Sequence, residues 1–181
     1  MNDIVYLAAA PVAAPGASQT AHALLNRLYE QVTGSPAPAL LKQPRGKPYF
    51  ASGPWHCSIT HTKTMVFCAL SPCPIGMDAE PMDRTVMEKT AKRVLSPREY
   101  AVYEAQKQTF ATFWTLKEAY VKYTGEGIGS NLQQLSFVQG PEGWRLEESD
   151  LFFSQLVTKQ HFLSVCTSSP VKLQFVTINS Q

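Results

Sequence analysis

The spacing of apolar residues predicts an amphipathic helix near the start of the chain. Between residues 18 and 33, apolar side chains recur every three or four positions, at Ala21, Leu24, Leu25, Leu28, Tyr29 and Val32. This period places them on one face of a helix. Gly34 follows directly, and a glycine in that position predicts the end of the helix.

The next stretch, from Ser35 to Pro54, has a different composition. It holds five prolines together with the basic residues Lys42, Arg45 and Lys47. We expect a long ordered loop here, and long loops inside compact domains tend to be functional.

Short runs of apolar and β-branched residues follow. They are CSITH from Cys57, TMVFCALS from Thr64 and PIGMDAE from Pro74. Separated by short polar or proline-containing segments, these runs predict three strands in a meander.

The helical period returns after Arg84. One side of this segment carries Val86, Met87, Thr90, Ala91, Val94 and Leu95. Ser96, Pro97 and Glu99 then predict a new helix start, with Ser96 as N-cap, Pro97 at the first helical position and Glu99 completing a capping box. A long helix is expected over 110–123, ending near Gly125.

From Leu135 onward the sequence alternates again and predicts antiparallel strands. The runs are LSFVQ, GWRLEE, LFFSQLVT, HFLSVCTS and VKLQFVTI, with a turn at Gly140–Gly143. Strands and helices in this order predict an α+β protein of two related halves.

Composition narrows the class of protein. The 181 residues suit one compact domain or two small halves sharing a core. Hydrophobic residues make up 44% and charged residues 17%, which excludes a mainly disordered chain. The net charge of +2 argues against a protein that coats nucleic acid.

Cysteine use and the N-terminal residues favour a soluble, cytoplasmic protein. The four cysteines form no CxxC pair, so reduced thiols are the simplest interpretation. No run reaches the ~18 apolar residues of a membrane-spanning helix. Asp3 and the absence of a basic residue before the first apolar stretch argue against a secretion signal.

The first candidate for chemistry is the pair Asp78 and Glu80. On a strand, residues two apart point to the same face, about 6.5–7 Å apart at Cα. Paired carboxylates repel unless a cation lies between them, and hard oxygen ligands suit Mg²⁺. The alternative is a strand end with two solvated acids.

The second candidate lies on the long helix. Trp114, Glu118 and Lys122 are spaced four apart and share one face. Because Phe110, Phe113 and Tyr120 supply an apolar face, we expect the Trp114 face to border a cleft. The alternative is an ordinary surface pair of Glu118 and Lys122 beside a core tryptophan.

The third candidate combines Arg45 and Lys47 with Thr60 and His61. A glycine between two cations in a proline-fixed loop can bring positive charge close to a phosphate, and a protonated histidine adds a donor. A solvated loop and a histidine at a strand end would explain the same residues.

Taken together, the motifs resemble one family. RGKP, CSITHT, PIGMDAE, LSPREYA and FWTLKEAYVKYTGEGI, in this order over roughly residues 45–128, are similar to the 4′-phosphopantetheinyl transferase superfamily, and closest to its compact, single-chain, surfactin-synthetase-activating type. The resemblance implies Mg²⁺-dependent transfer of the phosphopantetheine arm of coenzyme A to a serine of an acyl, peptidyl or aryl carrier protein, with release of adenosine 3′,5′-bisphosphate.

The resemblance also implies residue roles. Asp78, Glu80 and Glu118 would be metal ligands, and Glu118 would take the serine proton directly or through a water. Lys122 would neutralise charge on the phosphate oxygens. The residues expected to hold coenzyme A are Arg45, Lys47, Thr60, His61, Asp78 and Lys122. Lys117 would either contact phosphate or be structural.

The implied fold has two α+β halves related by a pseudo-twofold axis, each with helices packed on a small antiparallel sheet. Residues 1–74 would form the nucleotide side and residues 75–181 the metal side of one compact unit. We expect a monomer whose carrier-protein contacts include cations within 84–98. Residues 1–20 contain no Lys or Arg, unlike single-chain relatives, which bears on the affinity for coenzyme A.

The same residues allow three alternatives. The first is an inactive relative that binds coenzyme A or a carrier protein. The second is a metal-dependent phosphodiesterase or nuclease, which would favour a broader basic track. The third is a zinc site formed by His56, Cys57, His61 and Cys73, whose spacing matches no structural pattern.

Overall fold

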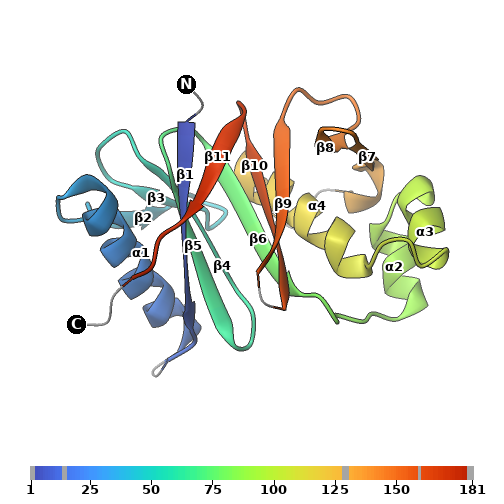
Figure 1. The fold of residues 1–181 in the computed structure, drawn as a ribbon, viewed down its shortest axis with the longest axis horizontal. Coiled ribbons are helices and arrows are strands. Elements are labelled where there is room, and N and C mark those ends of the chain that lie inside the picture. Colours follow the sequence, from blue (N-terminus) through green and yellow to red (C-terminus); the bar gives the residue numbers. More distant parts are fainter. Residues whose placement is uncertain (1–2, 14–15, 128–130, 159, 179–181) are drawn as a thin grey trace.

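The structure is a computed structural model that describes residues 3–13, 16–127, 131–158 and 160–178. It confirms an α+β architecture, with two main sheets and helices packed on them. Figure 1 shows α1 beside the first sheet at one end of the molecule and α2 and α3 at the other end.

The first sheet has the strand order β11-β1-β5-β4. Its strands are β1 (Asp3–Pro11), β4 (His56–His61), β5 (Met65–Ser71) and β11 (Val171–Phe175). β5 is antiparallel to both β1 and β4, whereas β11 lies parallel to β1. A separate hairpin is formed by β2 (Leu40–Lys42) and β3 (Pro48–Phe50).

The second sheet has the order β6-β10-β9-β8-β7 and is antiparallel throughout. Its strands are β6 (Ile75–Pro81), β7 (Phe137–Gly140), β8 (Gly143–Leu146), β9 (Phe152–Thr158) and β10 (His161–Thr167). In the pairing of β6 with β10, Asp78 lies opposite Ser164.

The structure corrects four strand predictions. The three-strand meander is wrong, because β6 pairs with β10 and not with β5. The antiparallel tail is wrong for β11, which is parallel to β1. The loop predicted over 35–54 contains the β2–β3 hairpin. β1 was not predicted, since a central strand with buried faces lacks clear alternation.

Four α-helices are described, together with a 3₁₀ turn η1 (Leu132–Gln134). They are α1 (Ala17–Thr33), α2 (Glu88–Val94), α3 (Pro97–Glu104) and α4 (Phe110–Thr124). The predicted stop of α1 at Gly34 and the capping box of α3 are confirmed. α2 begins later than the pattern predicts, and Met87, expected on its apolar side, is 77% exposed.

The apolar core has three parts. Between the two sheets, β1 and β5 pack against β6 and β10, with Val5, Leu7, Phe67, Ala69, Met77, Ala79, Leu163 and Val165. α1 covers the other face of the first sheet, and α4 packs on β6 and β10 of the second. In the part of the chain that the structure describes, no helix has the length and apolar character needed to cross a membrane.

Candidate active site

Alternation along β6 positions two carboxylates beside α4. Met77 and Ala79 face the first sheet and lie in the core between the sheets. Gly76, Asp78 and Glu80 therefore face the opposite way, toward α4. The predicted pairing of Asp78 and Glu80 on one face follows from this arrangement.

Gly76 allows the close approach of α4 to β6. A β-carbon on this residue would lie 2.0 Å from the carbonyl oxygen of Ala119 and 2.3 Å from the backbone nitrogen of Tyr123. Both contacts are with backbone, which cannot rotate away. Because Ala119 follows Glu118 directly, this contact also sets how far Glu118 lies from β6.

We expect Gly76→Ala to lower the free energy of unfolding by about 3 kcal/mol, since added volume in a packed contact strains both elements. Urea unfolding followed by circular dichroism measures the change. Gly140→Ala is the matched control, because its nearest atom would be 3.8 Å away. Equal stability of the two variants would show that the β6–α4 contact yields easily.

Asp78 is bound on one oxygen only. Its Oδ1 accepts hydrogen bonds from the Thr60 hydroxyl at 2.8 Å and from Lys122 Nζ at 2.7 Å. The residue is 6% exposed, and its Oδ2 is buried without a hydrogen-bond partner among the described residues. Such an atom normally has a partner, so Oδ2 is a candidate ligand for a cation.

Glu80 forms an ion pair with Arg84. The Arg84 guanidinium also lies over the Trp114 ring, 4.7 Å from its centroid. Burial raises the pKa of Glu80, and the Asp78 charge acts in the same direction, whereas Arg84 opposes them. The positive charge of Arg84 therefore partly compensates the negative charge of Glu80.

Glu118 is the second acid with an unpartnered oxygen. Its Oε1 is buried without a hydrogen-bond partner among the described residues, and the residue is 6% exposed. Burial raises its pKa, and the charges of Asp78 and Glu80 raise it further, while Lys122 and Arg84 lower it. A raised pKa suits a group that accepts a proton near neutral pH.

Glu118→Gln should therefore stabilise the protein in the presence of a chelator. A carboxyl whose pKa is raised by folding contributes stability that is fully present below its unfolded-state pKa and is lost as the pH rises through the folded-state pKa. At pH 8 we expect the variant to melt about 2–4 °C higher, the shift for about 1 kcal/mol. The difference should shrink toward pH 5, as differential scanning calorimetry can test. A variant that melts lower at pH 8 would contradict the raised pKa.

The basic loop lies against the C-terminal end of α4. Lys47 Nζ donates to the carbonyl of Tyr123 at 2.5 Å, and Arg45 donates to the carbonyl of Glu126. Cations are favoured at this end of a helix. Burial lowers the pKa of Lys47. The structure thus places both predicted phosphate ligands on backbone carbonyls next to the site helix.

Thr60 and His61 are separated by strand alternation. Thr60 is buried and reaches Asp78, while His61 is exposed at the end of β4. The structure therefore brings Thr60, Asp78, Lys122 and Glu118 into one cluster, and leaves His61 at its margin. Ile128, the last residue of the resembling stretch, lies outside the described residues.

Lys117 is structural in its contacts. It is 0% exposed and forms an ion pair with Glu99 at 2.7 Å. Its Nζ also donates to the carbonyls of Leu132 and Leu135. Burial lowers the pKa of Lys117, and Glu99 counteracts this. Of the two roles left open by the sequence, the contacts support the structural one.

Phe110 lies on a different face of α4 than the sequence predicts. This ring stacks on Trp114, with centroids 5.7 Å apart, so it shares the Trp114 face. Arg84 lies over both rings. The face expected to border an open cleft is therefore partly covered at its N-terminal end by an aromatic stack and a guanidinium.

Sequence reasoning missed two sets of residues beside the carboxylates. Arg84 was expected only among the cations that contact the carrier protein, not beside Glu80. Thr115, Ser164 and Gln155 form a buried hydrogen-bond network that joins α4 to β9 and β10, with Thr115 Oγ1 and Ser164 Oγ 2.7 Å apart. Single polar residues within apolar runs are the only signal for this network in the sequence.

The zinc alternative is wrong, because His56 and His61 lie at opposite ends of β4 and the adjacent His56 and Cys57 point to opposite faces of the sheet. Within the described residues, no three His, Cys, Asp or Glu side chains are placed to hold a metal ion. Cys57 is buried, and burial raises the pKa of its thiol to about 12, which disfavours the thiolate that zinc requires.

Asp78, Glu80 and Glu118 also do not form a ready-made metal site, because their oxygens do not converge on one point in the described arrangement. Lys122 holds Asp78, and Arg84 holds Glu80. The chemistry of the donor set nevertheless fits Mg²⁺. It offers three carboxylates, two of which have a buried unpartnered oxygen.

Comparison with known proteins finds a family match over the segment that carries these residues. A sequence model described as the 4′-phosphopantetheinyl transferase superfamily matches residues 74–166, which include β6 and α4. A 4′-phosphopantetheinyl transferase of Bacillus subtilis is 29% identical over 143 residues, covering 71% of this chain and 62% of the relative.

Two further relatives are also 4′-phosphopantetheinyl transferases. The 4′-phosphopantetheinyl transferase HetI of Nostoc sp. is 34% identical, covering 54% of this chain and 45% of its own. The 4′-phosphopantetheinyl transferase Sfp of Bacillus subtilis strain 168 is 34% identical, and the match covers 52% of this chain and 44% of the relative. The matched parts thus cover between 44% and 62% of the length of these relatives. Since the family match takes in more than half of the chain and contains all three carboxylates, the chain belongs to the 4′-phosphopantetheinyl transferase superfamily.

Proposed function

We propose that the protein transfers the 4′-phosphopantetheine arm of coenzyme A to a serine hydroxyl of an apo acyl, peptidyl or aryl carrier protein. The serine oxygen forms a bond to the phosphorus that bears the pantetheine arm, and the pyrophosphate bond breaks, so that adenosine 3′,5′-bisphosphate leaves. The observation that carries this proposal is the pair of buried, unpartnered oxygens, Asp78 Oδ2 and Glu118 Oε1, within the family segment.

Asp78, Glu80 and Glu118 are the residues that would hold Mg²⁺. The ion would supply positive charge to the pyrophosphate and polarise it. Burial raises the pKa of Glu80 and of Glu118, and the neighbouring carboxylates add to this effect. A divalent cation beside these groups would favour their charged forms.

Three residues of the chain would have the other roles in the transfer. Glu118 would accept the serine proton, directly or through a water, because its raised pKa makes it a better base than an ordinary carboxylate. Lys122, 2.7 Å from Asp78, would stabilise charge on the phosphate oxygens. Thr60 would keep Asp78 oriented through its hydrogen bond.

Arg45, Lys47 and His61 would bind the 3′-phosphoadenosine end. His61 is exposed and available. Arg45 and Lys47 would exchange carbonyls of the α4 terminus for phosphate oxygens, which form stronger, charge-assisted hydrogen bonds with these cations.

We further propose two related halves, residues 1–74 and 75–181, in one monomeric unit. The strand orders β1-β5-β4 and β6-β10-β9 are alike, and α1 and α4 each pack on the face away from the other sheet. β11, from the later range, joins the first sheet. A cytoplasmic location and a carrier-protein surface among the cations of 84–98 remain parts of this proposal.

The test mixes the protein with coenzyme A, Mg²⁺ and apo carrier proteins of the acyl, peptidyl and aryl types. Mass spectrometry should show addition of the arm to the carrier serine. If no carrier is modified although the protein binds coenzyme A or a carrier in calorimetry, the inactive relative becomes the better explanation.

A further inference from the structure

Arg84 reaches the carboxylate site from the turn that ends β6. Its backbone N–H donates to the carbonyl of Pro81 at 3.1 Å, which brings the chain back beside the strand. The side chain forms an ion pair with Glu80, and only 30% of the Arg84 side chain and 21% of the Glu80 side chain are exposed. Solvent and salt therefore screen this pair less than a pair on the open surface.

A second set of contacts holds the guanidinium independently of Glu80. It lies over two stacked rings of α4, 4.7 Å from the Trp114 centroid and 5.6 Å from the Phe110 centroid. A guanidinium within about 6 Å of an aromatic ring is attracted to the face of that ring. Arg84 can thus release Glu80 and still keep its place on α4.

Glu80 is the carboxylate for which Arg84 and a divalent cation would compete. Arg84 occupies its Oε1, and the Arg84 charge lowers the pKa of Glu80 against the effect of burial. Since the oxygens of the three carboxylates do not converge, at least one side chain has to move before all three share an ion. A divalent ion carries twice the charge of a guanidinium and, in the case of Mg²⁺, approaches oxygen to about 2.0–2.1 Å. Such an ion can therefore displace the arginine.

We propose that Arg84 is a positioning residue that acts through Glu80: it holds this carboxylate until a divalent cation arrives, and it competes with the cation for it. The inference rests on the proposed metal role of Asp78, Glu80 and Glu118. It adds that a residue outside this set controls how tightly the site binds the metal.

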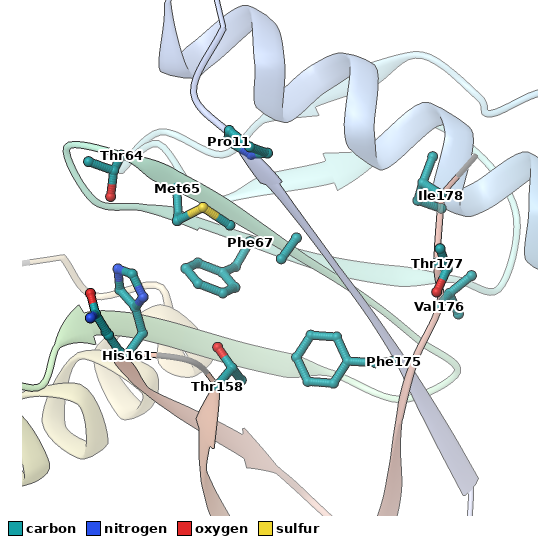
Figure 2. Close-up of a pocket in the computed structure, with 12 residues that line it drawn as sticks. Pro11, Thr64, Met65, Phe67, Thr158, His161, Phe175, Val176, Thr177 and Ile178 are labelled. Atoms are coloured by element: carbon teal, nitrogen blue, oxygen red, sulfur yellow. The ribbon is translucent and has the colours of Figure 1, made fainter. Parts of the chain in front are cut away.

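The hollow in Figure 2 is a separate feature of the molecule. It lies beside β5 and the start of β10, with Phe67 and His161 in its wall. The described residues that line it do not include Glu80, Arg84 or Trp114. A substitution of Arg84 therefore does not alter this wall, and a change in metal affinity reports on the carboxylate site.

Calorimetric titration of the full chain with Mn²⁺ tests the proposal. Arg84→Met keeps an unbranched apolar stem but removes the charge. It should bind Mn²⁺ about threefold to tenfold more tightly, because a partly exposed competing pair is gone. A purely structural role of Arg84 would give the opposite sign, since a disturbed site binds metal less well.

Lys89→Met is the matched control. It removes the same charge at an exposed position five residues along the chain. Its affinity for Mn²⁺ should stay near that of the unmodified chain. Circular dichroism verifies that each variant is folded. Unchanged or weaker binding in Arg84→Met would overturn the proposal, and so would an equal gain in Lys89→Met.

A double-mutant cycle separates the pair from a general effect of charge. In a Glu80→Gln background, Arg84→Met should change the affinity for Mn²⁺ by less than about twofold, because the competing pair is already absent. An equal gain in both backgrounds would contradict a role through Glu80. If Glu80→Gln binds no measurable Mn²⁺, the comparison of Arg84→Met with Lys89→Met decides.

The result can be told apart from that of the proposed transfer. If the unmodified protein binds Mn²⁺ and modifies a carrier, but Arg84→Met binds no more tightly, only the role of Arg84 fails. If the unmodified protein binds no Mn²⁺, the metal role of the carboxylates and the role of Arg84 fail together. Tighter binding by Arg84→Met without modification of any carrier supports the role of Arg84 and counts against the transferase activity alone.

Discussion

Asp78→Ala is expected to lower the rate of arm transfer by about 10³-fold, the scale on which a preorganised electrostatic group contributes to catalysis. The substitution removes the unpartnered Oδ2 and leaves Lys122 and Thr60 without their shared acceptor. Transfer from coenzyme A to an apo carrier protein, followed by mass spectrometry over time, measures the effect.

The control for this prediction is Asp83→Ala, the same change at an exposed position five residues along the chain. It should retain near-normal transfer. Calorimetric titration with Mn²⁺ adds a readout that does not depend on turnover, and we expect Asp78→Ala to weaken metal binding. Transfer at the normal rate by Asp78→Ala would remove Asp78 from the active site.

The largest expected loss of stability is in Lys117→Met. Removing one member of a buried ion pair leaves the other charge uncompensated, at a cost of about 3–5 kcal/mol. Here Glu99 would remain at 0% exposure, and among the described residues only the backbone N–H groups of Ser96 and Phe137 would bind it. Urea unfolding at neutral pH measures the loss.

Lys92→Met is the matched control, because Lys92 pairs with Glu88 on the surface. It should unfold close to the unmodified protein, since exposed pairs contribute little. The double variant Lys117→Met with Glu99→Gln should recover part of the loss, because the stranded charge is gone. A Lys117→Met protein as stable as Lys92→Met would show that the pair is not needed for the fold.

Local rules predicted the helices better than the sheets. The α3 start followed from Ser96 and Glu99, and the end of α1 from Gly34, because caps depend on adjacent residues. The partner of β6 could not be predicted, since pairing depends on residues about 85 positions away in β10.

Within the candidate site, the motifs indicated Asp78, Glu118 and Lys122. The structure places these three residues close to one another, with Lys122 paired to Asp78. The part played by Arg84 could not be read from the sequence. Its ion pair with Glu80 depends on the turn after β6 and on the Trp114 ring of a distant helix. A charge balance of this kind is set by tertiary packing.

The parallel pairing of β11 with β1 has a consequence for how the protein reaches its fold. Asp3 lies opposite Val171, so the first sheet has its full set of strands only when a late segment returns to an early one. Closing so long a loop carries a large entropic cost before any contact compensates for it. During synthesis β1 would leave the ribosome long before β11 and expose an unpaired edge meanwhile. Long-range strand pairing of this kind slows folding, so a chaperone would have most to protect while β1 still lacks β11.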